Sequence, residues 1–122
     1  MTSPLPLAAR TLRILWLEDD STLRHAFGMV ANDLGADIAM AADHAEVIER
    51  LKSHEYDWIV TDYQIGGLPS HEFIRQLLGE GRRVAVVTGD ATRVPRSLDV
   101  PVFQKPVRLG EVIVSLTESE RD

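Results

Sequence analysis

The sequence predicts a single α/β domain, in which a doubly wound sheet of five parallel strands carries helices on both faces. Short apolar runs alternate along the chain with stretches whose apolar residues recur at helical spacing, and this alternation is typical of right-handed βαβ crossovers and a parallel sheet. The second and fifth runs are the weakest, which suits the two edges and gives the strand order 2-1-3-4-5. Acidic or small polar residues follow the central runs, at the end of the sheet where ligands bind in such folds.

Composition limits the classes of function. The chain has 122 residues, which suits one domain, and a formal net charge of −6. Without a Lys/Arg cluster it is a poor partner for nucleic acid or an anionic membrane. Cysteine is absent, which excludes disulfides, thiolate metal sites and thiol nucleophiles and fits a cytoplasmic location. Residues 1–11 are expected to form a flexible tail without the layout of a signal peptide, residues 12–118 the domain, and residues 119–122 a polar end.

The first strand is the apolar run 13–17, which ends at Glu18-Asp19-Asp20. A helix follows it, capped by Asp20 or Ser21 and closed by Gly35. The apolar stripe of this helix consists of Leu23, Phe27, Val30, Ala31 and Leu34. Apolar and polar residues alternate only in part over residues 36–41, which indicates a weaker strand at an edge of the sheet.

The second helix begins at Asp43 and Glu46, which resemble the two ends of a capping box, and its stripe consists of Val47, Ile48 and Leu51. The third strand is the buried run that ends at Asp62, and Gly66 and Gly67 turn the chain away from it. Pro69 and Ser70 begin a third helix, whose inward residues are Phe73, Ile74, Leu77 and Leu78 and which ends near Gly79 or Gly81.

The fourth strand, residues 84–87, ends at Thr88-Gly89, and the fifth, residues 100–103, ends before Lys105. Pro101 places the fifth strand at an edge, because proline donates no hydrogen bond to a neighbour. Residues 89–104 must cross over and build most of that strand, whereas a helical crossover takes about a dozen residues or more. The fourth helix is therefore expected to be short or absent. A last helix follows from Leu109, Val112, Ile113 and Leu116.

The strand ends bring together groups that suit a metal ion. In the order 2-1-3-4-5 the first and third strands are neighbours, so Glu18-Asp19-Asp20 and Asp62 face each other across the switch point. Carboxylates this close repel each other unless a cation or a proton compensates. Mg²⁺ takes oxygen ligands of this kind. Asp19 and Asp62 are the natural pair of direct metal ligands, and Glu18 or Asp20 could act through water. A backbone carbonyl just past Asp62 could complete the ligands that the protein supplies.

The fourth and fifth strand ends add groups that suit a phosphoryl group. The Lys105 ammonium is a compact positive charge, the Thr88 hydroxyl is a hydrogen-bond donor, and Gly89 permits a close backbone approach. Each residue alone is more often an ordinary loop residue, but four strand ends with suitable groups together predict a Mg²⁺-assisted phosphoryl site with Asp62 as acceptor. The four histidines lack a metal-ligand spacing and are expected at the surface.

The ordered set Glu18-Asp19-Asp20, Asp62, Thr88-Gly89 and Lys105-Pro106 resembles the signature of response-regulator receiver domains of two-component signalling, over about residues 12–118. The resemblance implies the flavodoxin-like, CheY-like fold and a signalling receiver, not a metabolic enzyme. It implies that Asp62 accepts a phosphoryl group from a histidine kinase or a histidine phosphotransfer protein, with Mg²⁺ as cofactor. The implied metal ligands are Asp19, Asp62, the main-chain carbonyl of Gln64 and, through water, Glu18.

The same resemblance gives the other residues their roles. Lys105 resembles the lysine that pairs with a phosphoryl oxygen, and its bond to Pro106 resembles the cis peptide of the family. Thr88 resembles the hydroxyl that moves onto the phosphoryl group, and Tyr63 and Gly89 fall at phosphoryl-binding positions. Gln64 and Asp90 occupy positions that influence hydrolysis of the aspartyl phosphate in the family.

Several positions depart from the family pattern. Gly66 replaces a frequent proline, Pro69-Ser70 replaces an Asp-Gly pair, and Val102 stands where an aromatic switch residue is usual, with Phe103 beside it. With a short fourth crossover, the chain is similar to receivers linked to hybrid histidine kinases. The departures also support an alternative, a pseudo-receiver that binds partners without switching. An aspartyl hydrolase of the haloacid dehalogenase type would need Asp-x-Asp after the first strand, and a flavodoxin a phosphate loop there, so both are discarded.

Overall fold

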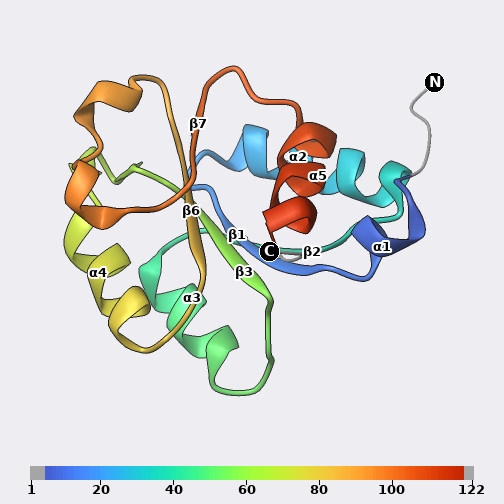
Figure 1. The fold of residues 1–122 in the computed structure, drawn as a ribbon, viewed down its shortest axis with the longest axis horizontal. Helices are drawn as coiled ribbons and strands as arrows, with labels where there is room; N and C mark the ends of the chain where they lie inside the picture. The colour runs from blue at the N-terminus through green and yellow to red at the C-terminus, as the bar shows by residue number, and fades with distance from the viewer. Residues whose placement is uncertain (1–4, 120–122) are drawn as a thin grey trace.

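The computed structural model describes residues 5–119 and contains the expected parallel sheet (Figure 1). Its strand order is β2-β1-β3-β6-β7, which is the predicted order 2-1-3-4-5. The strands are β1 (Arg13–Leu17), β2 (Asp37–Ala41), β3 (Trp58–Asp62), β6 (Val84–Thr88) and β7 (Val102–Gln104). The strands β3 and β6 are buried along their whole length, whereas β2 and β7 are the edges. The fold class is thus confirmed.

Helices cover both faces of the sheet, as Figure 1 shows. The helices α2 (Ser21–Leu34) and α5 (Leu109–Ser119) pack on one face against Ile14 and Trp16 of β1. The helices α3 (His44–Leu51) and α4 (His71–Gly79) pack on the other face against Leu15 and Leu17. This division follows from the period of two along a strand, which turns alternate side chains to opposite faces. Within residues 5–119, no helix is both long and apolar enough to cross a bilayer.

The ends of α2 and α3 follow the expected caps. Asp20 caps α2, because its Oδ1 accepts hydrogen bonds from the main-chain N–H groups of Thr22 and Leu23. Gly35 closes α2 in the left-handed conformation, with φ of 73°, which a residue without a Cβ adopts at little cost. Asp43 caps α3 through the N–H of Glu46. These caps fix the entry of each helix beside the strand that precedes it.

The expected flexible tail is wrong for residues 5–11. These residues fold back onto the domain and form the short helix α1 (Leu7–Arg10). Leu5 and Ala9 are buried in the cluster that lies under α2 and α5, and the N–H of Leu5 donates to the carbonyl of Leu34 over 3.0 Å. Burial of these apolar side chains supplies the stability that the short segment lacks on its own. Residues 1–4 and 120–122 lie outside the described residues.

The fourth crossover contains two 3₁₀ turns in place of an α-helix, as the short segment predicts. The turns are η1 (Ala91–Arg93) and η2 (Arg96–Leu98). The side chains of Val94 and Leu98 are buried in the cluster beneath α4, so they anchor the crossover. The strand β7 begins at Val102, two residues later than predicted, because Pro101 contributes only its carbonyl, which accepts from Val86 N–H over 2.9 Å.

A small β-hairpin that the sequence did not predict follows β3. It consists of β4 (Gln64–Ile65) and β5 (Leu68–Pro69), which pair antiparallel. Gly66 and Gly67 form its turn with φ of 62° and 78°, in the region that favours glycine. The hairpin begins two residues after Asp62, so its position bears on the site.

Candidate functional site

The carboxylates of β1 and β3 meet at the C-terminal edge of the sheet. Leu17 and Thr61 are register partners in parallel strands, so the residues that follow them, Glu18 and Asp62, lie next to each other. Carboxylate oxygens of Glu18, Asp19 and Asp62 all lie within 4.8 Å of one another. Glu18 and Asp62 are 2% and 4% exposed, whereas Asp19 is open to solvent. Two carboxyl groups of this cluster are therefore removed from water.

Hydrogen bonds fix the acidic loop after β1. The main-chain N–H of Asp20 donates to Glu18 Oε2 over 3.1 Å. The Arg24 guanidinium, from the end of the first turn of α2, donates to the carbonyls of Glu18 and Asp19 over 3.0 and 3.3 Å. Arg24 thus braces the backbone that carries both acidic side chains. Sequence reasoning missed this role, although Arg24 lies within one helical turn of the Asp20 cap.

Lys105 completes the cluster from the end of β7. Its Nζ lies 2.8 Å from Asp62 Oδ1 and 3.8 Å from Glu18 Oε1. The N–H of Lys105 donates to the carbonyl of Thr88 over 2.7 Å, which ties the lysine to the end of β6. Partial burial lowers the pKa of Lys105, but hydrogen bonding and charge from Asp62, with Glu18 and Asp19, outweigh it and raise the pKa above its ordinary value. Lys105 is therefore a positive charge that faces the carboxylates.

One lysine does not neutralise this cluster. Burial, together with the hydrogen bond and charge of Asp62, raises the pKa of Glu18 from 4.5 to about 8. Glu18 Oε1 is buried and makes no hydrogen bond to any residue in the range 5–119. Buried carboxylates that are incompletely compensated favour a proton or a further cation beside them. The donor set, which is carboxylate oxygens without nitrogen or sulfur, fits a hard divalent ion such as Mg²⁺.

An open cavity of about 460 Å³ lies over the cluster. The residues predicted to accept or bind the phosphoryl group or to hold the metal all line it: Glu18, Asp19, Asp62, Tyr63, Gln64, Thr88, Gly89 and Lys105. Asp20 and Asp90 line it as well. The Thr88 hydroxyl is turned toward the next loop, where it accepts from the N–H of Asp90 over 3.2 Å and lies 3.3 Å from the Asp90 carbonyl. Arg93, which was not predicted from the sequence, also lines the cavity.

The hairpin is joined to the acidic cluster. The N–H of Gly66 donates to Asp19 Oδ2 over 2.9 Å, and the N–H of Ser70, at the base of the hairpin, donates to the carbonyl of Tyr63 over 2.7 Å. The turn of the hairpin therefore uses one oxygen of Asp19 and leaves the other free toward the cavity. Sequence spacing gave no signal for this contact, because Asp19 and Gly66 lie on different crossovers.

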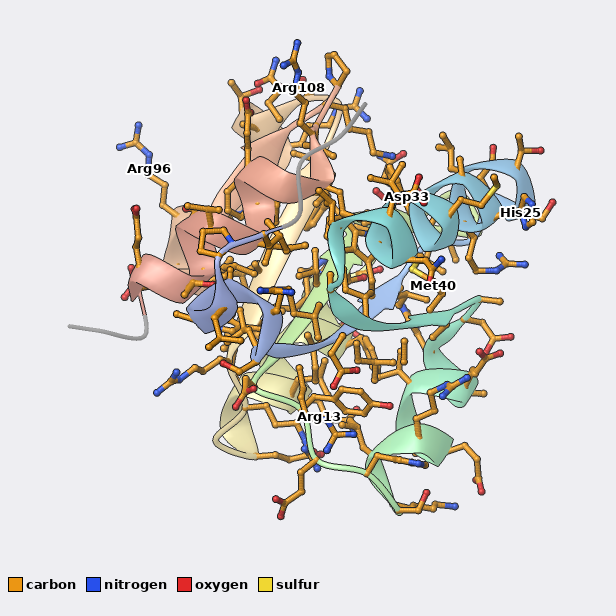
Figure 2. The ribbon with its side chains drawn as sticks, turned by 90° about the vertical axis from the view of Figure 1, so that its right-hand side faces the viewer. Arg13, His25, Asp33, Met40, Arg96 and Arg108 are labelled. Carbon is orange, nitrogen blue, oxygen red and sulfur yellow. The ribbon has the colours of Figure 1, made fainter. Side chains whose placement is uncertain are left out.

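None of the histidines lines the cavity. His25 lies exposed on α2, as Figure 2 shows. His44 differs from the expectation of a surface residue because it is half-buried. Its ring stacks on Phe73 with centroids 4.0 Å apart, and its Nε2 lies 3.3 Å from Ser70 Oγ. Burial lowers the pKa of His44, despite the opposing charge of Asp43.

Comparison with known proteins agrees with this geometry. The family model of the response regulator receiver domain matches residues 14–100. The chain belongs to this family. Receiver domains are signalling modules and not classical enzymes, and they bind Mg²⁺ at an acidic pocket. The receiver signature that the sequence carries is therefore confirmed at the level of the family and the fold.

Individual relatives come from several kinds of two-component protein. The receiver is 34% identical over 74 residues to the autoinducer 2 sensor kinase/phosphatase LuxQ of Vibrio cholerae, which covers 61% of the chain and 9% of that kinase. It spans only about a tenth of the length of such sensor kinases. It is 30% identical over 87 residues to the chemotaxis protein CheY of Pseudomonas aeruginosa, which covers 67% of the chain and 70% of CheY.

Solved structures share the fold at lower identity. The response regulator TrrA of Thermotoga maritima, determined in complex with Mg(2+)-BeF, superposes with a TM-score of 0.72 at 16% identity. The superposition covers 88% of this chain and 97% of TrrA. At this identity the likeness establishes the arrangement of strands and helices, and the roles of individual residues rest on the site geometry.

Proposed function

We propose that this receiver accepts a phosphoryl group on Asp62 from the phosphohistidine of a histidine kinase or a histidine phosphotransfer protein. The observation that carries the proposal is the meeting of Asp62 with Lys105, 2.8 Å away, and with the carboxylates of Glu18 and Asp19. This meeting occurs at the floor of one open cavity. The similarity to sensor kinases supports a partner of the kinase class, and a cytoplasmic location stays a prediction.

The metal site uses residues that the cavity already groups. Asp19 and Asp62 would hold Mg²⁺ directly, together with the main-chain carbonyl of Gln64, and Glu18 would act through water. When bound, the ion offsets the negative charge of the cluster and of the phosphoryl oxygens. Glu18 Oε1, which is buried without a hydrogen bond within residues 5–119, and the set of carboxylate oxygens without a histidine or cysteine ligand support this assignment. That TrrA was determined with Mg(2+)-BeF supports it for the family.

Transfer requires little beyond position and charge. An oxygen of Asp62 attacks phosphorus, and the bond from phosphorus to the imidazole nitrogen breaks as the new oxygen–phosphorus bond forms. The Lys105 ammonium contacts Oδ1 of Asp62 and would pair with an oxygen of the transferred phosphoryl group. Gly89 lines the cavity and would offer its main-chain N–H to the phosphoryl group. The N–H of Tyr63 donates to the carbonyl of Val87 over 2.9 Å, so Tyr63 would have to release that bond in order to bind a phosphoryl oxygen. Thr88 exchanges its contacts with Asp90 for a phosphoryl oxygen.

Phosphotransfer tests this function directly. Phosphorylated histidine kinases and histidine phosphotransfer proteins are mixed with the wild type and with Asp62→Asn in the presence of Mg²⁺. We expect at least one donor to pass its label to the wild type and none to pass it to Asp62→Asn. If no donor labels the wild type, and small phosphodonors also fail, the proposal is wrong.

The alternative of a pseudo-receiver has one observation in its favour. Val102 is an exposed aliphatic residue at the position of the usual aromatic switch, and the crossover before it consists of two 3₁₀ turns. A pseudo-receiver would bind its partner equally well with and without a phosphoryl group. Measuring the affinity of the receiver for its kinase in both states separates the two functions, because only the switching receiver changes affinity.

A further inference from the structure

Arg93 is a second basic residue of the cavity, and the site described above leaves it without a role. It lies at the end of η1, five residues past Thr88, and lines the same cavity as Asp62 and Lys105. The turn that carries it is well held. Asp90 caps η1 at its start, and Val94, which follows Arg93, is buried under α4. Arg93 therefore has an exposed side chain on a backbone segment that is held in place.

The present partner of Arg93 holds it weakly. Its Nε lies 3.7 Å from Asp90 Oδ2, and the side chains of the two residues are 64% and 52% exposed. Exposed ion pairs of this length contribute little, because water screens them. The guanidinium can leave Asp90 at small cost and reach another anion at the cavity.

The position of the Asp90 side chain does not depend on its ion pair with Arg93. Its other oxygen, Oδ1, accepts hydrogen bonds from the main-chain N–H and the hydroxyl of Thr92. These two bonds lower the pKa of Asp90 more than the charge of Arg93 does. Asp90 thus keeps its two hydrogen bonds to Thr92 when the arginine moves away. The ion pair with Asp90 keeps the Arg93 side chain beside the cavity, and the fold of η1 does not require it.

The balance of charges among the side chains of the cavity indicates which ligand Arg93 could bind. Its acidic side chains are Glu18, Asp19, Asp20, Asp62 and Asp90, and its basic ones are Lys105 and Arg93. Lys105 already faces Asp62. A phosphoryl group changes Asp62 from a single negative charge to a charge of about −2. Mg²⁺ would offset part of this added charge, and Arg93 is the remaining cationic side chain among the residues that line the cavity.

We propose that Arg93 is a phosphoryl-binding residue, whose guanidinium leaves Asp90 and donates to the oxygens of the phosphoryl group on Asp62. This inference rests on the proposed function. Arginine suits the role because its planar group presents parallel N–H donors to a phosphoryl group. The short crossover makes the contact available, because it brings η1 to the cavity directly after β6. Arg93 then links the phosphoryl group to the segment that replaces the fourth helix.

The test compares Arg93→Ala and Arg93→Lys with a matched control, Arg96→Ala. Arg96 lies on η2, does not line the cavity, and points away from the domain in Figure 2. Each protein is phosphorylated with acetyl phosphate and Mg²⁺ over a range of donor concentrations, and circular dichroism verifies its fold. We expect Arg93→Ala to lower the second-order rate constant about tenfold, which corresponds to about 1.4 kcal/mol. Arg93→Lys should lose less, since it keeps the charge, and Arg96→Ala should stay within about twofold.

A second readout does not depend on the rate. In the wild type, the NMR signal of the Arg93 Nε–H should shift and exchange more slowly with water once Asp62 is phosphorylated. Equal rate constants for Arg93→Ala and Arg96→Ala, or an unchanged Arg93 signal in the phosphorylated protein, would overturn the inference while the acceptor function stands. Failure of acetyl phosphate to label the wild type at all would instead count against the proposed function.

Discussion

Replacing Lys105 by methionine removes the one lysine that faces the buried carboxylates of Asp62 and Glu18. Breaking a buried ion pair by removing one partner destabilises a protein by about 3–5 kcal/mol, because a charge is left unpaired. The Lys105 side chain is 35% exposed, so water screens part of that loss. We expect the free energy of unfolding in metal-free buffer to fall by about 2 kcal/mol.

A double-mutant cycle isolates the pairing. In the Asp62→Asn background the amide leaves less charge for Lys105 to compensate, so the same Lys105→Met change should cost only about 0.5 kcal/mol. The coupling energy is then about 1.5 kcal/mol. Urea unfolding in EDTA, followed by the fluorescence of the buried Trp16 and Trp58, measures each free energy. Lys52→Met is the control, since Lys52 pairs with Glu49 at an exposed site and should change stability little.

Two results would be incompatible with a stabilising charge pair between Lys105 and Asp62. Additive effects within about 0.5 kcal/mol would mean that Lys105 and Asp62 do not interact as charges. A Lys105→Met protein as stable as Lys52→Met would mean that the carboxylates need no cation in the metal-free state. Either outcome would remove the electrostatic basis for a phosphoryl and metal site at this edge of the sheet.

Three further predictions concern the surroundings of the site. Mg²⁺ at a hundred times its dissociation constant should raise the free energy of unfolding by about 2.7 kcal/mol; calorimetry of Asp19→Asn should show little of this gain, and an equal gain would exclude Asp19 as a ligand. His44 has a lowered pKa when folded, so its unfolded form binds protons first and stability should fall as the pH drops below about 6.5; urea unfolding of His44→Asn should depend less on pH, and identical profiles would contradict this. Gln64→Ala should slow the loss of phosphate from Asp62 severalfold, if the amide orients the attacking water; an unchanged rate of dephosphorylation would exclude that role.

The sequence predicted the parts of the fold that depend on periodicity and local caps. The apolar runs gave the strands β1, β3 and β6, and the weak runs gave the edges. Asp43 and Gly35 marked helix ends because capping depends on residues that are near in the chain. The site was predictable for the same reason, since parallel strands end at one edge and the residues after them must meet there.

The missed features depend on contacts between distant segments. Leu5 and Ala9 lie in a short segment without periodicity, and only their burial under α2 and α5 reveals α1. The hairpin strands are two residues long, too short to give a pattern. The contacts of Arg24 with the acidic loop and of Gly66 with Asp19 follow from how the crossovers are placed in space. Arg93 was overlooked because its place at the cavity depends on the two 3₁₀ turns.

The central claim is that the converged strand ends make Asp62 a phosphoryl acceptor. Intact-mass spectrometry of the wild type and of Asp62→Asn, each incubated with acetyl phosphate in Mg²⁺ or in EDTA, tests it most directly. We expect a mass increase of one phosphoryl group for the wild type in Mg²⁺, which is stable in acid, lost in base, and absent both in EDTA and in Asp62→Asn. An unmodified wild type in Mg²⁺, or an equal increase in Asp62→Asn, would contradict it.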